Sequence, residues 1–216
     1  MEKFMSEIDK MREEVAYFMR RLYIQQLTTT SGGNISVKIG DLVLITPSAL
    51  DKGRITGDQI GIMDMNGKMK TENLQPSIET NLHLEIYRTR PDVASVVHAH
   101  PLAASAYAAS THKINTRYLA ESYVVAGEIA YAGYHCIGTL ELARETAAAV
   151  SSANCVIMKN HGALAVGQTL LEAFDRLEVL ENTARLNLIC ESVLKDKLSP
   201  LAPAELRALD VLIGRK

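Results

Sequence analysis

The chain has 216 residues, 47% of them hydrophobic, and a formal net charge of −2 at pH 7. The length fits one domain, assigned to residues 1–216, and is enough to bury a full core without disulfides. This charge gives no electrostatic footprint for nucleic acid or an anionic membrane, and no apolar run approaches the roughly 20 residues that span a bilayer. Three scattered cysteines and a charged N-terminus predict a reduced, cytoplasmic, soluble protein.

The first third of the chain predicts one helix followed by short strands. Apolar residues at helical spacing indicate a helix over residues 6–26, which ends in a polar run. Two strands, residues 35–39 and 42–46, read as a hairpin, and a third strand at residues 60–65 turns at Asn66-Gly67.

The rest of the chain alternates helices with short apolar runs. The predicted helices are a segment entered at Pro76 and capped by Ser77, then residues 102–109, 139–151, 170–194 and 203–213. The predicted strands are residues 93–97, 155–158 and 163–166. Residues 114–137 show no regular pattern.

Two loops are rich in glycine and small hydroxyl side chains. The first, residues 31–36, contains Gly33 and Asn34, and the second is Thr46-Pro47-Ser48. Together with Ser77 they offer donors for a phosphate or a sugar hydroxyl. Ordinary turn chemistry is the simpler interpretation of each loop alone, and neither matches a Walker or Rossmann phosphate loop. No arginine or lysine falls clearly inside these motifs.

Three histidines lie where apolar strands are predicted to end. Side chains alternate across a strand, so His98 and His100 point to the same face, and His161 follows a second apolar run. Gly162 then permits a sharp backbone path. An HxH pair alone also fits two ordinary histidines at a strand end. Three histidines with an open fourth position, however, are typical of catalytic zinc.

The predicted helix after Pro76 carries two further polar residues of interest. Glu79 lies in its first turn, where a carboxylate suits the helix dipole and, beside the histidines, would serve as a proton carrier. His83 lies four residues later on the same face. No HExxH pattern surrounds His83, so we expect a buried structural histidine.

Five motifs in order make the pattern specific: SGGNIS at 31–36, TPSA at 46–49, PSIE at 76–79, RPDVASVVHAHP at 90–101 and KNHG at 159–162. At these residues the chain resembles the class II aldolase/adducin family, and within it the zinc-dependent L-fuculose-1-phosphate aldolases. The resemblance runs from about residue 7 to residue 194.

The resemblance implies an α/β fold, a three-layer αβα arrangement with a central, largely antiparallel or mixed sheet. It implies a homotetramer with active sites at subunit interfaces. It implies His98, His100 and His161 as ligands of one Zn²⁺ per subunit, other divalent metals being possible, with Glu79 binding zinc at rest. The residues implied around the substrate phosphate are Gly33, Asn34, Thr46, Ser48 and Ser77.

The implied activity is cleavage or formation of a C–C bond in a ketose 1-phosphate, giving dihydroxyacetone phosphate and an aldehyde through a metal-stabilised enediolate. Glu79 is expected to move the proton at the enediolate carbon, with its pKa raised by the apolar site. Tyr118 or Tyr123 of a neighbouring subunit is expected to protonate the aldehyde oxygen.

The sequence departs from the family pattern in three places. Ile78 stands where a serine is common, Ala49 where a glycine is usual, and residues 201–216 contain no tyrosine. Alternatives within the fold are a pentulose-phosphate 4-epimerase, a branch that usually carries Asp at the position of Glu79, a methylthioribulose-phosphate dehydratase and, less favoured, a decarboxylase. A non-catalytic, adducin-like scaffold is the alternative from another class, and the intact histidines and Glu79 argue against it.

Overall fold

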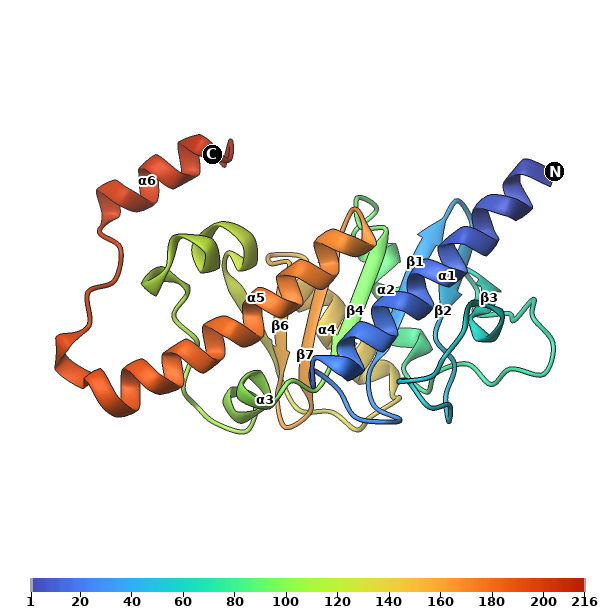
Figure 1. Cartoon of the computed structure of the whole chain (residues 1–216), viewed down its shortest axis with the longest axis horizontal. Helices are drawn as coiled ribbons and strands as arrows, with labels where there is room; N and C mark the ends of the chain where they lie inside the picture. The colour runs from blue at the N-terminus through green and yellow to red at the C-terminus, as the bar shows by residue number, and fades with distance from the viewer. Residues whose placement is uncertain (1, 216) are drawn as a thin grey trace.

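A computed structural model describes residues 2–215 and places seven strands in one sheet, in the order β3-β2-β1-β4-β7-β6-β5 (Figure 1). All neighbouring strands are antiparallel except β5 and β6, which are parallel. The strands are β1 Asn34–Ile39, β2 Leu42–Ile45, β3 Gly61–Asp64, β4 Ser95–Ala99, β5 Ile129–Ala132, β6 Cys155–Met158 and β7 Gly162–Gly167.

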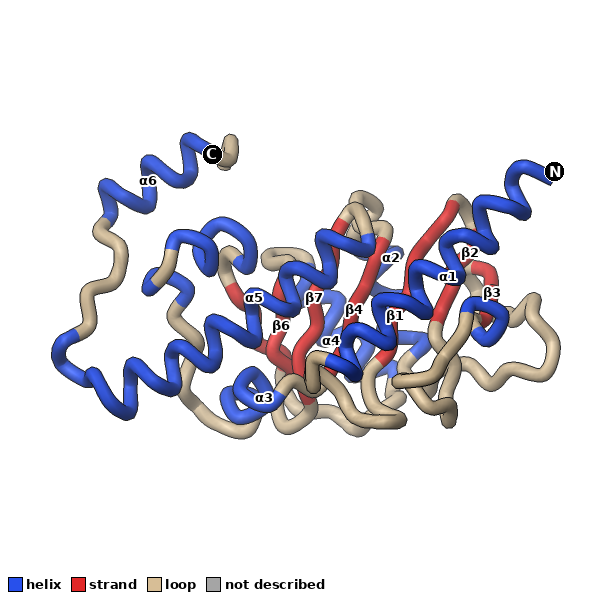
Figure 2. The backbone as a smooth tube through the Cα atoms, viewed as in Figure 1, coloured by secondary structure: helices blue, strands red, loops and turns tan. Residues whose placement is uncertain are grey.

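The α-helices cover both faces of this sheet. They are α1 Glu2–Ile24, α2 Thr80–Thr89, α3 Leu102–Ala108, α4 Leu140–Val150, α5 Leu170–Ile189 and α6 Pro203–Leu212. One buried core joins the sheet to α1, α3 and α5, and a second joins it to α2 and α4. Figure 2 shows α1 and α5 crossing in front of the strands. The predicted three-layer αβα architecture with a mixed sheet is therefore confirmed.

The centre of the sheet positions the functional residues. Every residue of β4 and β7 is buried, because helices cover both faces, and this explains their continuous apolar sequences. Strand β4 lies between β1 and β7, with His98 opposite Asn34 on one side and Leu164 on the other. The end of β4 therefore meets the start of β1 and the start of β7.

Strand β5 lies inside residues 114–137, where the sequence predicted no regular structure. It is an edge strand that pairs only with β6, and three of its four residues are half-buried, so its sequence has no clear alternation. Two short π-helical segments are present. One spans residues 122–126, and the other, residues 190–194, continues α5. The predicted helix 170–194 is thus an α-helix only to Ile189.

The predicted cap of α2, Ser77, lies two residues before the observed N-cap, Glu79. The Ser77 carbonyl accepts hydrogen bonds from the Thr80 backbone N–H (3.0 Å) and hydroxyl (2.7 Å), which forms a turn before the helix. Glu79 is consequently the N-cap of α2 and does not lie in its first turn. Among residues 2–215, no helix combines the length and apolar character needed to cross a bilayer.

Candidate active site

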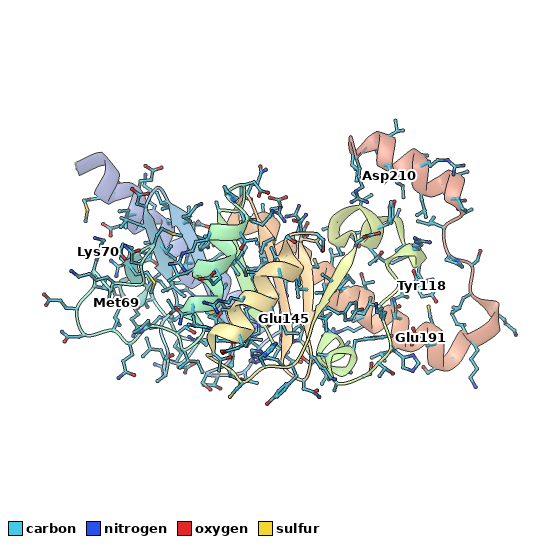
Figure 3. The ribbon with its side chains drawn as sticks, turned by 180° about the vertical axis from the view of Figure 1, so that it is seen from behind. Met69, Lys70, Tyr118, Glu145, Glu191 and Asp210 are labelled. Atoms are coloured by element: carbon cyan, nitrogen blue, oxygen red, sulfur yellow. The ribbon has the colours of Figure 1, made fainter. Side chains whose placement is uncertain are left out.

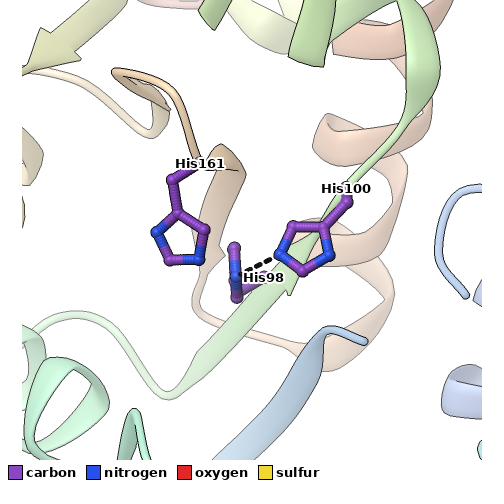
Figure 4. A group of neighbouring side chains, drawn as sticks. All are labelled: His98, His100 and His161. Carbon is purple, nitrogen blue, oxygen red and sulfur yellow. Dashed lines mark hydrogen bonds between the residues drawn. The ribbon is translucent and has the colours of Figure 1, made fainter. Parts of the chain in front are cut away.

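Three histidines from two segments of the chain converge at the ends of two central strands of the sheet. His98 lies near the end of β4, His100 follows that strand, and His161 lies in the turn between β6 and β7. One nitrogen from each ring lies within 4.8 Å of the others (Figure 4). The cluster forms because β4 pairs with β7, which begins directly after His161.

The His98 ring is oriented by the neighbouring strand. Its Nδ1–H donates to the Ala163 carbonyl of β7 at 2.9 Å, which leaves the Nε2 lone pair free. That Nε2 atom lies 3.1 Å from Nε2 of His100 (Figure 4). A histidine that donates one nitrogen to a carbonyl and presents the other to a shared centre is typical of metal ligands.

Glu79 joins the histidines from the N-terminus of α2. Its Oε1 atom lies 3.1 Å from His161 Nε2, its Oε2 atom lies 3.3 Å from His98 Nε2, and the residue is only 5% exposed. Asn34 Nδ2 donates to Oε2 at 2.7 Å. The α2 helix thus brings one carboxylate against the rings of two strand-end histidines.

The electrostatics of Glu79 differ from the sequence-based expectation. Burial by itself would raise the pKa of Glu79, but the charge of His98 and the close approach of the His161 and His98 rings outweigh it. The pKa of Glu79 therefore lies well below its usual value, and the prediction of a raised pKa is wrong. The carboxylate is therefore ionised and available to bind a cation.

The cluster fits a divalent metal ion. Glu79 Oε1 is buried and, among the described residues, has no hydrogen-bond donor, although it faces His161. Burial, with the charges of His98 and His161, lowers the pKa of His100 to about 4, so its ring is neutral at pH 7 and can coordinate. Three imidazoles and one carboxylate are a donor set that zinc accepts.

The turn that carries His161 owes its shape to two residues. Asn160 adopts the left-handed conformation, with φ of +53°. Gly162 does not need it, but a Cβ atom there would lie 2.6 Å from both the Ala99 carbonyl oxygen and Cδ2 of His100. The expectation that Gly162 provides the sharp path is therefore wrong: Asn160 makes the turn, and Gly162 leaves room for the His100 ring.

A cavity of about 350 Å³ opens beside the histidines. It is lined by His100, His161 and Glu79 and, from the residues predicted around phosphate, by Gly33, Asn34, Ser48 and Ser77. Thr46 is the exception. It does not line the cavity, and its Oγ1 accepts the Ile35 backbone N–H at 3.1 Å.

Four of the five predicted phosphate residues thus line one cavity, and the backbone at Gly33 and at the nearby Ala49 explains the small residues found there. Gly33 has φ of +67°, and a Cβ atom there would lie 2.8 Å from the His98 carbonyl oxygen. Ala49, which also lines the cavity, has φ of +58°, a conformation that favours the glycine usual at this position.

Lys52 also lines the cavity, although no sequence motif predicted it there. Its side chain is 1% exposed, its Nζ donates to the Pro47 carbonyl at 2.5 Å, and no carboxylate pairs with it among the described residues. Burial lowers the pKa of Lys52 to about 8. Its position three residues after the TPSA motif was the available signal, because a loop that folds back on Pro47 returns that residue to the cavity.

The two predicted tyrosines lie elsewhere in the chain. The Tyr123 hydroxyl donates to the Asp210 carboxylate, at 3.0 Å from each oxygen, and lines a separate cavity of about 540 Å³. Tyr118 lies toward the C-terminal segment, in the region of Glu191 and Asp210 (Figure 3). Within one chain, neither tyrosine lines the cavity beside the histidines.

Comparisons with known proteins agree with this geometry. The family model for the class II aldolase and adducin N-terminal domain matches residues 13–188. The L-fuculose phosphate aldolase of Methanococcus maripaludis strain S2 is 36% identical over 174 residues, covering 81% of this chain and 94% of that protein. The 5-deoxy-D-ribulose 1-phosphate aldolase of Bacillus thuringiensis is 29% identical over 198 residues, covering 89% and 91%.

A solved structure of an L-fuculose 1-phosphate aldolase superposes with a TM-score of 0.84 at 30% identity, covering 94% of this chain and 95% of that one. Sequence, fold and the histidine cluster therefore lead to one assignment. The chain belongs to the class II aldolase/adducin family, whose aldolases are metal-dependent lyases.

Proposed function

We propose that this protein is a zinc-dependent aldolase that cleaves or forms a C–C bond in a ketose 1-phosphate of the fuculose-1-phosphate type. One observation carries the proposal: a single cavity is lined by His100, His161 and Glu79 of the histidine cluster together with the polar residues Ser48, Ser77 and Lys52. Such a cavity suits a substrate with metal-chelating oxygens at one end and a phosphate at the other.

His98, His100 and His161 would hold the metal, with Glu79 beside them. Bound zinc would act as a Lewis acid and stabilise the negative charge that develops on the ketose oxygens. The His98 hydrogen bond to Ala163 keeps one coordinating nitrogen directed at this position.

Glu79 transfers a proton to or from C3 of the ketose. In cleavage, the bond between C3 and C4 of the ketose breaks, the C4 hydroxyl releases its proton to solvent and becomes the aldehyde, and the electron pair stays with C3. Glu79 takes up a proton from solvent and delivers it to C3, which completes dihydroxyacetone phosphate. In condensation, the ionised Glu79 carboxylate removes that proton.

The phosphate lies among neutral donors and one cation. Ser48 and Ser77 offer hydroxyl groups, Gly33 offers close approach to the backbone, and Lys52 supplies the positive charge that the motifs lack. Asn34 is closer to the reacting end than the resemblance implies, since its amide nitrogen is bound to Glu79.

The remaining parts of the proposal concern assembly. The enzyme is a cytoplasmic homotetramer in which Tyr118 or Tyr123 of a neighbouring subunit protonates the aldehyde oxygen in the direction of condensation. Support comes from the resemblance and from the position of both tyrosines away from their own chain's cavity.

The test is retro-aldol cleavage. Zinc-loaded protein is incubated with the 1-phosphates of fuculose, rhamnulose, ribulose and 5-deoxyribulose, and dihydroxyacetone phosphate is detected by coupled reduction. Release that a chelator abolishes and zinc restores is expected, and the ranking of substrates identifies the aldehyde. A zinc-replete protein that releases no dihydroxyacetone phosphate contradicts the proposal and favours an epimerase, dehydratase or decarboxylase. Failure to bind metal favours the scaffold.

A further inference from the structure

Behind the candidate active site, five buried polar side chains form a continuous chain between β1 and α2. The Tyr87 hydroxyl and His83 Nδ1 each lie 2.6 Å from Ser36 Oγ. His83 Nε2 lies 2.5 Å from Asn34 Oδ1, and Asn34 Nδ2 reaches Glu79 Oε2 at 2.7 Å. None of the five residues is more than 5% exposed.

The orientation of the Asn34 amide gives a direction to every hydrogen bond in this series. Asn34 Nδ2 donates to Glu79 at 2.7 Å, and its Oδ1 therefore faces His83. Oδ1 only accepts, so the His83 proton must be on Nε2. His83 Nδ1 then accepts from Ser36, and Ser36 accepts from Tyr87.

The other end of the chain is consistent with this direction. Burial raises the pKa of the Tyr87 hydroxyl far above its usual value, so Tyr87 keeps its proton and donates it. Burial also lowers the pKa of His83 to about 3, so the ring is neutral and has a single N–H. Every donor faces one acceptor, and no proton has to be shared.

We propose that His83 is a positioning residue: as the Nε2–H tautomer, it locks the Asn34 carboxamide so that the amide nitrogen faces Glu79 and holds the carboxylate against His98 and His161. The consequence for turnover rests on the proposed function. The His83 tautomer and the orientation of Asn34 do not depend on the proposed function.

A flipped Asn34 amide shows what the lock prevents. It would bring Oδ1 within hydrogen-bond distance of the Glu79 carboxylate with no proton between two acceptors, which is unfavourable in a buried site. In water, an asparagine amide rotates freely between the two orientations. A neutral donor fixed on the far side of Asn34 removes that freedom, and His83 is the donor in place.

The first test is independent of activity. In two-bond ¹H–¹⁵N correlation spectra of ¹⁵N-histidine-labelled protein, with His83→Gln to assign the signals, His83 is expected as the neutral Nε2–H tautomer in both zinc-free and zinc-loaded protein. An Nδ1–H tautomer overturns the proposal. If the tautomer is as expected but no ketose phosphate is cleaved, the proposed function fails and the positioning role stands.

The second test compares two substitutions of similar size. His83→Gln keeps a nitrogen donor near the Nε2 position, and His83→Met keeps the volume without a donor. Turnover by His83→Met should fall about 10–100-fold with little change in KM, whereas His83→Gln should restore most of it. Thr183→Val, which removes an equally buried hydroxyl bonded to Ser122 and Val179, should lose stability and keep its turnover.

A double-mutant cycle shows whether His83 acts through Glu79. In a Glu79→Gln background, the turnover penalty of His83→Met should disappear, because there is no carboxylate left to position. Zinc affinity is measured in parallel as a readout besides turnover. Equal losses for the Gln and Met variants, or a full penalty in the Glu79→Gln background, mean that His83 is only a packing residue and overturn the proposal.

Discussion

The two ends of the cavity have opposite electrostatic deficits. At the histidine end, the ionised carboxylate of Glu79 lies against imidazole rings, and among the described residues only a proton on a histidine offsets its charge. At the serine end, the buried ammonium of Lys52 lies with neutral hydroxyls, and no carboxylate pairs with it among the described residues. Uncompensated buried charge is costly, so each end is completed by a ligand of the sign that it lacks. This polarity is the best physical reason to expect a metal and a phosphate in one cavity.

Removing one of the three histidines should abolish metal binding at the histidine end of the cavity. We expect His161→Ala or His98→Ala to lose bound zinc and all detectable aldolase activity while staying folded, because a three-histidine site loses a primary ligand. Metal analysis and circular dichroism check this prediction. The control is His135→Ala, an exposed histidine paired with Glu145. Full activity with zinc retained in His161→Ala would contradict the ligand assignment.

Neutralising Glu79 should separate metal binding from proton transfer. Glu79→Gln is expected to retain zinc and lose about 10²–10⁴-fold in turnover, the range for a lost proton carrier. Glu85→Gln removes a carboxylate of the same helix that pairs with Arg88, and should change turnover little. Near-normal turnover in Glu79→Gln would make Glu79 a helix cap and nothing more.

Removing Lys52 should weaken only the phosphate end. Lys52→Met is expected to raise KM for a ketose 1-phosphate about 10–100-fold, the equivalent of one charge-assisted hydrogen bond, with zinc content unchanged. Lys70→Met, at an exposed lysine that does not line the cavity, is the control. Unchanged KM in Lys52→Met would place the phosphate elsewhere.

The same lysine should give a distinctive pH dependence of stability. Between pH 8 and pH 10.5, its pKa values in the folded and unfolded chain, the folded protein binds fewer protons than the unfolded one. The free energy of unfolding should therefore rise with pH in this window, by on the order of 1 kcal/mol per pH unit, relative to Lys52→Met. Urea denaturation of both proteins across this range measures the difference. Parallel curves would show that Lys52 is not buried as a charge.

The smallest effect concerns the backbone beside the phosphate end. Ala49→Gly should stabilise the protein by about 1 kcal/mol, because alanine is strained at φ of +58°. Ala148→Gly, at an exposed position of α4, should have the opposite sign, by roughly 0.5–1 kcal/mol. Urea midpoints compare the two. Destabilisation by Ala49→Gly would show that the left-handed conformation carries no strain.

The sequence by itself determined where the candidate ligands lie along the chain. Residues 93–97 and 155–158 are apolar runs long enough only for buried strands, so the histidines that follow had to lie at strand ends, and period two placed His98 and His100 together. The positions of Glu79 and of the serine loops were predicted from short sequence motifs. These features depend on neighbours within a few residues, which a sequence records directly.

Tertiary structure alone decided the features that depend on distant neighbours. Strand β5 exists because β6 offers it an edge, and Lys52 lies in the cavity because its loop folds back on Pro47. The direction of the Glu79 pKa shift depended on whether burial or two histidines contributed more. Burial and charge act through space over a few ångströms, and which groups come that close is known only after the sheet and helices have packed.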